Sequence, residues 1–320
     1  MEKSASVYVA GHRGLAGSAI KRALEARGYT NLLTRTHAEL DLTCQAATEA
    51  FFQSTRPDYV FMAAAKVGGI LANNTFPAEF IYQNLTIQTN ILHAAYRAGT
   101  RRLLFLGSSC IYPKECPQPM KEEHLLTGPL EPTNEPYAVA KIAGIKMCQS
   151  YNRQYGTRFV AVMPTNLYGP NDNFDLETSH VLPALIRKFH EAKKSGAKEV
   201  VAWGTGNPRR EFLHADDLAD ACLFIMNLPD TTFDRLVRGT DAPLINIGMG
   251  QDIPIAALAL LIKEVVGFDG DIRFDTTKPD GTFQKLLDVG RLTALGWQAT
   301  TSLSDGIQST YRWCLDHHIF

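Results

Sequence analysis

The sequence of 320 residues lacks a long hydrophobic run and an excess of charge of one sign. No stretch approaches the roughly 18 apolar residues that a membrane-spanning helix needs. The 32 Lys and Arg residues are balanced by 33 Asp and Glu residues, which argues against a polycationic binder of nucleic acid. The first residues, Met1 to Ser6, do not have the pattern of a signal peptide. We therefore expect a cytoplasmic enzyme or binding protein that contacts neither nucleic acid nor membrane.

Paired cysteines are also lacking. No two of the six cysteines have the C-x-x-C spacing of zinc or redox motifs, so we expect no metal site. In a long chain without a secretory signal, free thiols are the default state. We expect most of them to be small buried apolar residues, and the six are Cys44, Cys110, Cys116, Cys148, Cys222 and Cys314.

The first half of the chain alternates short apolar runs with stretches of helical spacing. Continuous apolar strands that alternate with helices are typical of a parallel sheet covered on both faces. This pattern predicts an α/β fold, a doubly wound Rossmann parallel sheet with a smaller interleaved α/β lobe. The expected strands are 7–10, 32–33, 59–62, 103–106 and 159–162, and the expected helices are 15–26, 78–98 and 137–155.

The regular alternation of apolar strands and helices ends after Met163. Residues 164–175 are rich in Pro, Asn and Gly and are expected to form a loop. We expect residues 1–165 to form the first domain, with 215–248 returning to it, and residues 166–214 and 249–320 to form mainly a second lobe. Further elements are expected at 180–194, 200–203, 216–226, 244–247, 254–266, 271–275 and 302–315.

A glycine motif joins the first expected strand to the first expected helix. Gly11, Gly14 and Gly17 form a G-x-x-G-x-x-G pattern at the opening of that helix. Glycines let backbone N–H groups approach a pyrophosphate, and the helix dipole favours its negative charge. A simple tight turn would explain the glycines alone, but the strand before and the helix after favour a nucleotide-binding loop. The motif thus predicts a dinucleotide cofactor.

The residues after the second strand indicate which dinucleotide is bound. An acidic side chain there would bind the ribose of NAD, but the sequence has Arg35 instead. Arg35 and Arg13 can pair with a 2′-phosphate, so we expect NADP; the alternative is that both are solvated surface residues. Asp41 either caps the next helix or touches the adenine. Small residues at 63–65 and 68–69 either lie close to the cofactor or serve close packing.

A second motif predicts catalysis. Tyr137 and Lys141 have Y-x-x-x-K spacing on an expected helix, so both side chains lie on one face. A tyrosine titrates at about 10, and an adjacent ammonium together with a ribose hydroxyl can favour its anion near neutral pH. Ser108 follows the fourth strand, at the edge where open α/β sheets bind ligands. If the backbone stays extended there, Ser108 and Cys110 point the same way.

Together these motifs resemble the extended short-chain dehydrogenases/reductases that act on nucleotide sugars. Longer runs narrow the resemblance to the GDP-L-fucose synthases, over nearly the whole chain. The runs are AAAKVGGI at 63–70, GSSCIYP at 107–113, EPTNEPYA at 131–138, PTNLYGP at 164–170, RREFLH at 209–214 and KPDG at 278–281.

The resemblance implies conversion of GDP-4-keto-6-deoxy-D-mannose to GDP-L-fucose, by epimerisation at C3 and C5 and then reduction of the C4 ketone with NADPH. It implies Cys110 as the base and His180 as the acid, on opposite faces of the sugar. Their ordinary pKa values, about 8.5 and 6.5, bracket neutrality. Tyr137 would protonate the C4 oxygen, with Ser108 and Lys141 in support. A homodimer through the long helices at 78–98 and 137–155 is also implied.

The resemblance also assigns binding residues. Lys188, Trp203, Arg210 and Asp280 would contact the substrate, with the two cations suited to the diphosphate and Trp203 to stacking. One departure is His37, which stands where the family often has a basic contact to the 2′-phosphate. The residues expected to bind NADP are Gly11, Arg13, Gly14, Leu15, Gly17, Arg35, His37, Asp41, Leu42, Ala64, Leu106, Gly107, Lys141, Pro164, Asn166, Leu167 and His180.

Two other functions compete on the same scaffold. A nucleotide-sugar 4-epimerase or 4,6-dehydratase would keep NAD tightly bound, which the basic 2′-phosphate site and the pair of Cys110 and His180 disfavour. A non-catalytic NADP-binding sensor often loses the Tyr or Lys of Y-x-x-x-K, and both are intact here.

Overall fold

A six-stranded parallel sheet, in the order β2-β1-β3-β4-β5-β9, forms the centre of the computed structural model. The structure describes residues 1–239, 241–278 and 280–320. The predicted α/β fold with a doubly wound parallel sheet is confirmed. The strands are β1 (Val7–Ala10), β2 (Leu32–Leu33), β3 (Tyr59–Met62), β4 (Arg102–Leu106), β5 (Phe159–Pro164) and β9 (Leu244–Ile247).

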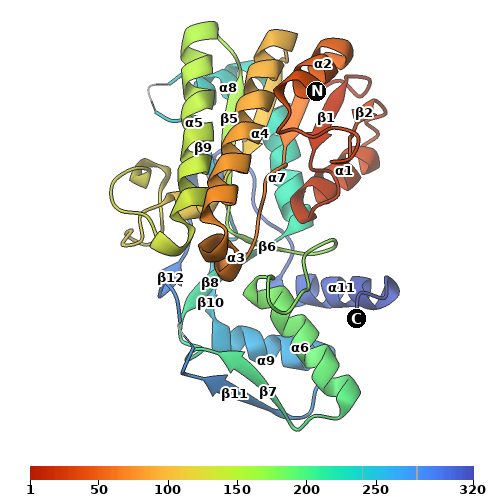
Figure 1. Cartoon of the computed structure of the whole chain (residues 1–320), viewed down its shortest axis with the longest axis vertical. Coiled ribbons are helices and arrows are strands. Elements are labelled where there is room, and N and C mark those ends of the chain that lie inside the picture. The colour runs from red at the N-terminus through yellow and green to blue at the C-terminus, as the bar shows by residue number, and fades with distance from the viewer. Residues whose placement is uncertain (240, 279) are drawn as a thin grey trace.

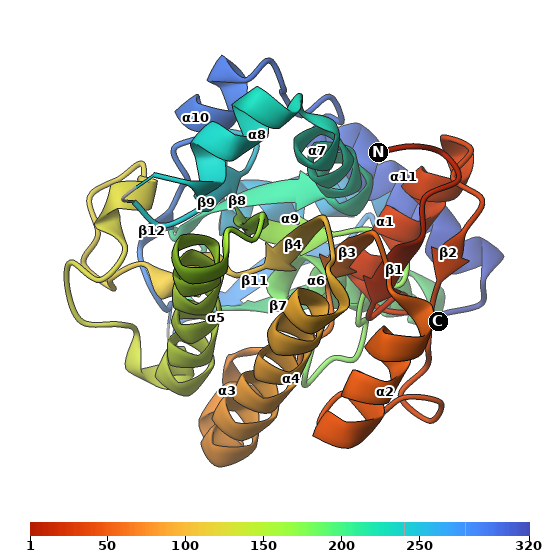
Figure 2. The same ribbon diagram turned by 90° about the horizontal axis from the view of Figure 1, so that it is seen from above.

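Helices cover both faces of this sheet (Figure 2). Successive residues of β1 belong to different cores: Val7 and Val9 pack in one, Tyr8 and Ala10 in the other. One face is covered by α1 (Leu15–Ala26), α7 (Ala215–Asn227) and α8 (Asp230–Val237), and the other by α2 (Gln45–Thr55), α4 (Pro77–Ala98) and α5 (Glu135–Tyr155).

The chain reverses its direction of winding at β1. This strand pairs with β2 on one side and with β3 on the other, which creates a topological switch point between the carboxyl ends of β1 and β3. Ligands of open α/β sheets bind at such points. Because the glycine motif follows β1 directly, the fold places it at the switch point.

A second lobe lies beyond the carboxyl ends of the strands (Figure 1). In it, α6 (Val181–Ser195), α9 (Ile255–Val266) and α11 (Leu303–Asp316) share a hydrophobic core. One sheet contains β10 (Asp252–Pro254), β8 (Arg209–His214), β12 (Gln284–Lys285) and β6 (Asn166–Tyr168), and another pairs β7 (Glu199–Trp203) with β11 (Asp271–Asp275). The short helices α3 (Ile70–Thr75) and α10 (Gly290–Ala294) lie in the connections.

The expected loop at 164–175 is wrong in its first part. Residues 166–168 form β6, because their backbone pairs in parallel with β8, from Asn166 opposite Phe212 to Tyr168 opposite His214. Five of the six cysteines are buried and all six are free, as expected, but Cys44 is exposed at the N-cap of α2. Within the described part of the chain, no helix is both long and apolar enough to cross a membrane.

Candidate active site

The glycine motif forms a close-packed turn between β1 and α1. Gly11 has a φ of +80°, and a Cβ there would lie 2.8 Å from the backbone nitrogen of Ala64. A Cβ at Gly17 would overlap the carbonyl of Gly11. Gly14 is the N-cap of α1 and has no side chain to cap it, so the first amides of the helix stay open to a ligand. The turn therefore has the shape and polarity of a pyrophosphate cradle.

A buried atom of a histidine in the glycine turn also supports a site for a dinucleotide. The Nδ1 atom of His12, within the glycine turn, is buried without a hydrogen-bond partner. Burial, with the charges of Arg13 and Lys21, lowers the pKa of His12 and so favours its neutral form. A buried polar atom at the switch point, beside open helix amides, fits a site built for a bound polar group.

The residues predicted for the 2′-phosphate are exposed near β2. Arg35 donates to the carbonyl of Thr34 (2.8 Å) and lies over the Phe51 ring, while Arg13 extends from the glycine turn. The exposed Nδ1 atom of His37 lies 3.8 Å from the Asp41 carboxylate. Both arginines thus remain accessible to an anion.

Asp41 is not the cap of the next helix. Its carboxylate accepts bonds from the backbone nitrogen (2.9 Å) and hydroxyl (2.7 Å) of Thr43, and these bonds lower its pKa. Cys44 occupies the N-cap of α2 instead. The bonds to Thr43 form a local turn because an Asp side chain reaches the backbone two residues ahead.

The other residues predicted for the cofactor lie mainly at the carboxyl ends of central strands. Ala64 contacts the glycine turn, and the side-chain amide of Asn166 donates to the Glu211 carbonyl (2.8 Å). Leu15 and Leu167 pack partly against one core, and Leu42 against the other. Leu106 and Pro164 end β4 and β5, and Gly107 follows β4. Their contacts with a cofactor stay predictions.

Tyr137 and Lys141 lie one turn apart on α5, as predicted. The buried Lys141 ammonium donates to the carbonyl of Leu106 (2.8 Å) and lies 5.6 Å from the centre of the Tyr137 ring. Burial lowers the pKa of Lys141 to about 8. Burial and the Cys110 thiol raise the pKa of Tyr137, and a hydrogen bond with Ser108 opposes them. Burial is the largest influence on the pKa of Tyr137, so the expected lowering does not appear with the adjacent ammonium alone.

Ser108 connects Cys110 with Tyr137, although the backbone is not extended as assumed. Residues 109–111 form a 3-10 turn that buries Cys110. Burial raises the pKa of the Cys110 thiol, while a hydrogen bond with Ser108 and the charges of Lys285 and Lys141 lower it. The tight turn thus brings together the side chains that the extended backbone was expected to align.

His180 stands at the amino end of α6. It occupies the N-cap position, but its side chain makes no capping bond. Neighbouring atoms lower its pKa by desolvation, although the side chain is exposed to solvent. Among the described residues, its imidazole makes no hydrogen bond with Ser108, Cys110, Tyr137 or Lys141. Its role as the acid stays a prediction.

The predicted substrate residues lie in the second lobe. Lys188 is half-buried, donates to the Val201 carbonyl (3.2 Å) and lies over the exposed Trp203 ring, 5.3 Å from its centre. Burial lowers the pKa of Arg210, and Asp280 opposes this effect. Both carboxylate oxygens of Asp280 accept bonds from Thr205, each at 2.7 Å. Pro279, within the KPDG run, lies outside the described residues.

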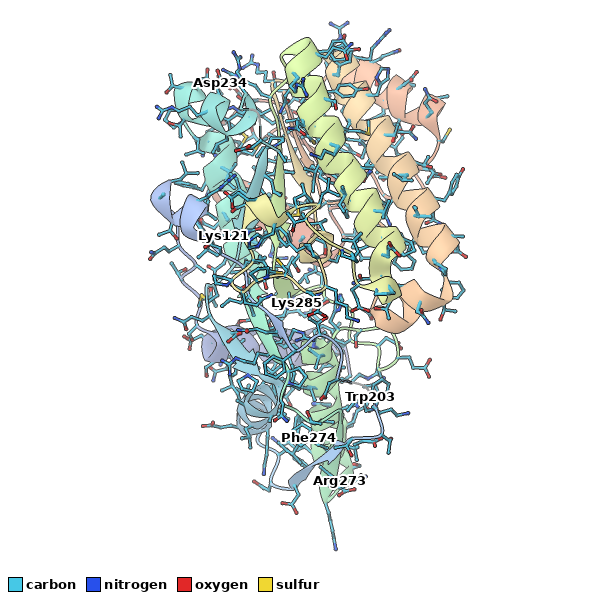
Figure 3. The ribbon with its side chains drawn as sticks, turned by 90° about the vertical axis from the view of Figure 1, so that its left-hand side faces the viewer. Lys121, Trp203, Asp234, Arg273, Phe274 and Lys285 are labelled. Carbon is cyan, nitrogen blue, oxygen red and sulfur yellow. The ribbon has the colours of Figure 1, made fainter. Side chains whose placement is uncertain are left out.

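Sequence reasoning missed Lys285. It lies on β12 between the two lobes (Figure 3), where the parallel pairing with β8 places it opposite Arg210. The Cys110 thiol and Lys285 influence each other's pKa, so the ammonium faces the proposed base. No local motif marks this lysine. Only the pairing of two distant strands, which the sequence pattern did not predict, could have found it.

A family model places the chain among known proteins. Residues 7–238 match the NAD dependent epimerase/dehydratase family. GDP-L-fucose synthase 1 of Arabidopsis thaliana is 60% identical, over 98% of this chain and 94% of its own length. GDP-L-fucose synthase of Escherichia coli K12 is 56% identical, over 97% of each chain.

Solved structures agree with this placement. A GDP-L-fucose synthetase from Naegleria fowleri, solved with NADP, has a TM-score of 0.87 at 28% identity and covers 100% of this chain and 96% of its own. A GDP-mannoheptose C4 reductase from Campylobacter jejuni, also with NADP, has a TM-score of 0.89 at 40% identity, over 98% and 99% of the two chains. These matches support a nicotinamide cofactor. The chain belongs to the NAD dependent epimerase/dehydratase family and, within it, to the GDP-L-fucose synthases.

Proposed function

We propose that the protein converts GDP-4-keto-6-deoxy-D-mannose to GDP-L-fucose by 3,5-epimerisation and NADPH-dependent reduction at C4. The observation that carries this proposal is the match of 56–60% identity to named synthases over nearly the whole chain. The clustering of Ser108, Cys110, Tyr137 and Lys141 supports it.

Epimerisation needs a base and an acid. The hydrogens at C3 and C5 are acidic because each is α to the C4 ketone. Cys110 as thiolate removes a proton, and the electron pair of the C–H bond moves into an enolate. His180 as imidazolium returns a proton to the carbon from the opposite face, which inverts it. Lys285 and Ser108 favour the thiolate that burial disfavours.

Reduction uses the other side chains of the cluster. When bound, the nicotinamide of NADPH would supply the hydride that C4 receives. Tyr137 gives its hydroxyl proton to the oxygen on which charge develops, and Ser108 donates a hydrogen bond to the same oxygen. Lys141, fixed by the Leu106 carbonyl, holds a positive charge beside the Tyr137 ring. Arg13 and Arg35 would hold the 2′-phosphate that distinguishes NADPH from NADH.

The second lobe would hold the GDP part of the substrate. Lys188 and Arg210 are cations in a partly buried setting, which strengthens their attraction for a diphosphate. The exposed Trp203 ring offers a face for stacking. Asp280 reaches the same region through Thr205 and orders the turn that carries Trp203.

The test is direct turnover. Purified protein with GDP-4-keto-6-deoxy-D-mannose and NADPH should consume NADPH and form GDP-L-fucose, identified by NMR of the product sugar. Oxidation of NADPH without inversion of the sugar at C3 and C5 would instead indicate a C4 reductase. Absence of both NADPH loss and product would overturn the proposal, and tightly bound NAD with no net redox change would favour a 4-epimerase.

Two variants separate the half-reactions. In D₂O without NADPH, Cys110→Ser should slow deuterium entry at C3 and C5 by about 100-fold, because a hydroxyl is a far weaker base near neutral pH. Tyr137→Phe should keep the exchange and slow reduction by about 100-fold. Mass spectrometry of the sugar and NADPH absorbance give the two rates. Normal exchange in Cys110→Ser would remove Cys110 from the base role.

We also propose a homodimer through α4 and α5. The two helices lie side by side on one face of the molecule (Figure 2), and Tyr82, Val139 and Tyr155 expose large apolar side chains on them. Such an exposed apolar face is typical of a contact with another protein surface. Light scattering after gel filtration should give twice the chain mass, and Tyr82→Glu should lower it toward that of one chain. A monomeric parent protein would contradict this.

A further inference from the structure

The side chain of the proposed acid His180 is not held in place by hydrogen bonds of its own within the described residues. Its position is therefore set by the backbone that precedes it. That backbone is internally ordered: the Asp175 carboxylate accepts bonds from the amide (2.9 Å) and hydroxyl (2.9 Å) of Thr178, and Ser179 donates to the Asp175 carbonyl (3.0 Å). Residues 175–179 thus form a turn held by its own hydrogen bonds, and a contact that positions this turn also positions the backbone of His180.

One backbone bond ties this turn to the first lobe. The amide of Gly69 donates to the carbonyl of Thr178 (3.2 Å), and it is the one bond between residues 172–180 and that lobe among the described residues. A Cβ on Gly69 would lie 3.0 Å from the Thr178 oxygen and 3.3 Å from the Ser179 oxygen. Both atoms belong to the backbone, so they give way only if the turn itself moves.

The backbone conformation of Gly69 does not require glycine. Its φ of −64° and ψ of 179° are open to any residue, so alanine there would bring no strain of its own. The glycine is needed only for the close approach. The sequence predicts that the small residues at 68–69 lie near the cofactor or serve close packing, and the structure places Gly69 against the turn that carries His180.

The segment that presents Gly69 is itself firmly held. The side-chain amide of Asn73, a residue that is 6% exposed, donates to the carbonyls of Gly68 (2.7 Å) and Gly69 (3.0 Å). On the neighbouring helix, Phe80 meets the ring of Tyr137 edge-on, with ring centres 6.3 Å apart. The 3-10 turn at 132–134, which leads into α5, also packs against α3. The segment that contains Gly69 and α3 is therefore next to both the His180 turn and the region of Tyr137.

We propose that Gly69 is a positioning residue for His180, and that it sets how closely the His180 turn approaches the sugar. The proposal rests on the proposed function, in which His180 returns the proton during epimerisation. Because the three atoms nearest to a Cβ on Gly69 all belong to the His180 turn, enlarging Gly69 should impair epimerisation and spare hydride transfer. A displacement of a few tenths of an ångström in a proton donor slows transfer by about tenfold.

The test measures the two half-reactions in Gly69→Ala. Deuterium at C3 and C5 of the inverted sugar, formed from GDP-4-keto-6-deoxy-D-mannose in D₂O without NADPH, reports epimerisation. Single-turnover reduction of NADP⁺ by GDP-L-fucose reports hydride transfer without epimerisation. We expect exchange to slow about tenfold and hydride transfer to stay within twofold of the parent protein. In a His180→Gln background, Gly69→Ala should cause no further loss of exchange, since it acts through the imidazole.

Matched variants make the outcome decisive. Gly239→Ala adds a methyl group where the nearest atom is 3.9 Å away, and it should match the parent in both assays. Asn73→Ala removes the side-chain bonds that hold the Gly69 segment, without adding bulk. It should cause the same selective loss, so it replaces Gly69→Ala if that variant does not fold. Exchange at the parent rate, or equal losses in both assays, would overturn the proposal. No exchange in the parent protein would instead overturn the proposed function.

Discussion

At the scale of single residues, the ammonium group of Lys141 is buried, and burial disfavours its positive charge. Lys141 is 3% exposed, and among the described residues its ammonium has one hydrogen-bond acceptor, the Leu106 carbonyl. Burial brings its pKa down to about 8. The folded chain therefore binds this proton less tightly than the unfolded chain. The protonated lysine costs stability at neutral pH, and this cost falls as pH rises from about 8 toward the unfolded value of about 10.4.

Lys141→Met should therefore stabilise the cofactor-free protein at pH 7 and abolish reduction. Removing the ammonium stabilises the fold by about 3 kcal/mol, the free energy that corresponds to its lowered pKa. The Leu106 carbonyl then loses its donor, which destabilises the fold by about 1 kcal/mol. We expect a net gain of about 2 kcal/mol in the free energy of unfolding by urea. The gain should shrink at pH 10, where the wild-type lysine is largely neutral when folded.

The exposed Lys146 on the same helix supplies the control. Lys146→Met removes an equal charge from solvent, so unfolding should change by less than about 0.5 kcal/mol at both pH values. If Lys141→Met is less stable than the parent at pH 7, the buried ammonium is not a cost of folding. In that case the helix needs the lysine for packing.

At the scale of elements, the unit of β1, glycine turn and α1 depends on backbone contact rather than on side chains. Gly11 combines a φ of +80° with a position where a Cβ would lie within 2.9 Å of the backbone of residues 63 and 64. Gly28 has nearly the same φ, +77°, but nothing within 4 Å. An alanine at either position would strain the backbone, but only at Gly11 would it also crowd neighbouring atoms.

Gly11→Ala should lower affinity for NADPH by at least about 100-fold, because crowding shifts the turn away from β3 and the open amides with it. Gly28→Ala should cost about 1 kcal/mol of stability from the left-handed backbone and leave NADPH binding unchanged. Fluorescence titration of NADPH and urea unfolding measure the two effects. Equal affinity in both variants would show that the cradle tolerates a methyl group.

The spacing of apolar residues predicted the elements whose contacts lie close together in the sequence. The helix Leu15–Ala26 and the strands at β1, β3 and β9 have the bounds that the spacing of apolar residues and the glycines predicted. The short strands β6, β8 and β12 were not predicted, because they are held by pairing between segments far apart in the chain. Tyr137 and Lys141 follow from helix spacing alone. Lys285 and Gly69 depend on contacts between lobes, and no local pattern encodes those contacts.

At the scale of the whole molecule, a buried carboxylate fastens the segments that join the two lobes. Glu211 is fully buried, and its oxygens accept bonds from the amides of Gly250 (2.7 Å) and Leu287 (2.9 Å). Its carbonyl accepts from the side chains of Thr165 and Asn166. Burial raises its pKa, and the amide bonds oppose this. Glu211 thus orders the neighbours of Arg210 and Lys285 on both sides of β8.

Glu211→Gln tests this role with almost no change in volume. One carboxylate oxygen becomes an NH₂ group that faces a backbone N–H, so one buried donor loses its acceptor. We expect the free energy of unfolding to fall by about 1–3 kcal/mol and the midpoint in urea to fall with it. The exposed Glu123, paired with Arg291, gives the matched control: Glu123→Gln should change stability by less than about 0.5 kcal/mol. Because Glu211 orders the strand that carries Arg210, its variant should also raise the KM for the GDP-sugar more than it lowers kcat. A variant with parental stability and KM would show that the lobes are fastened elsewhere.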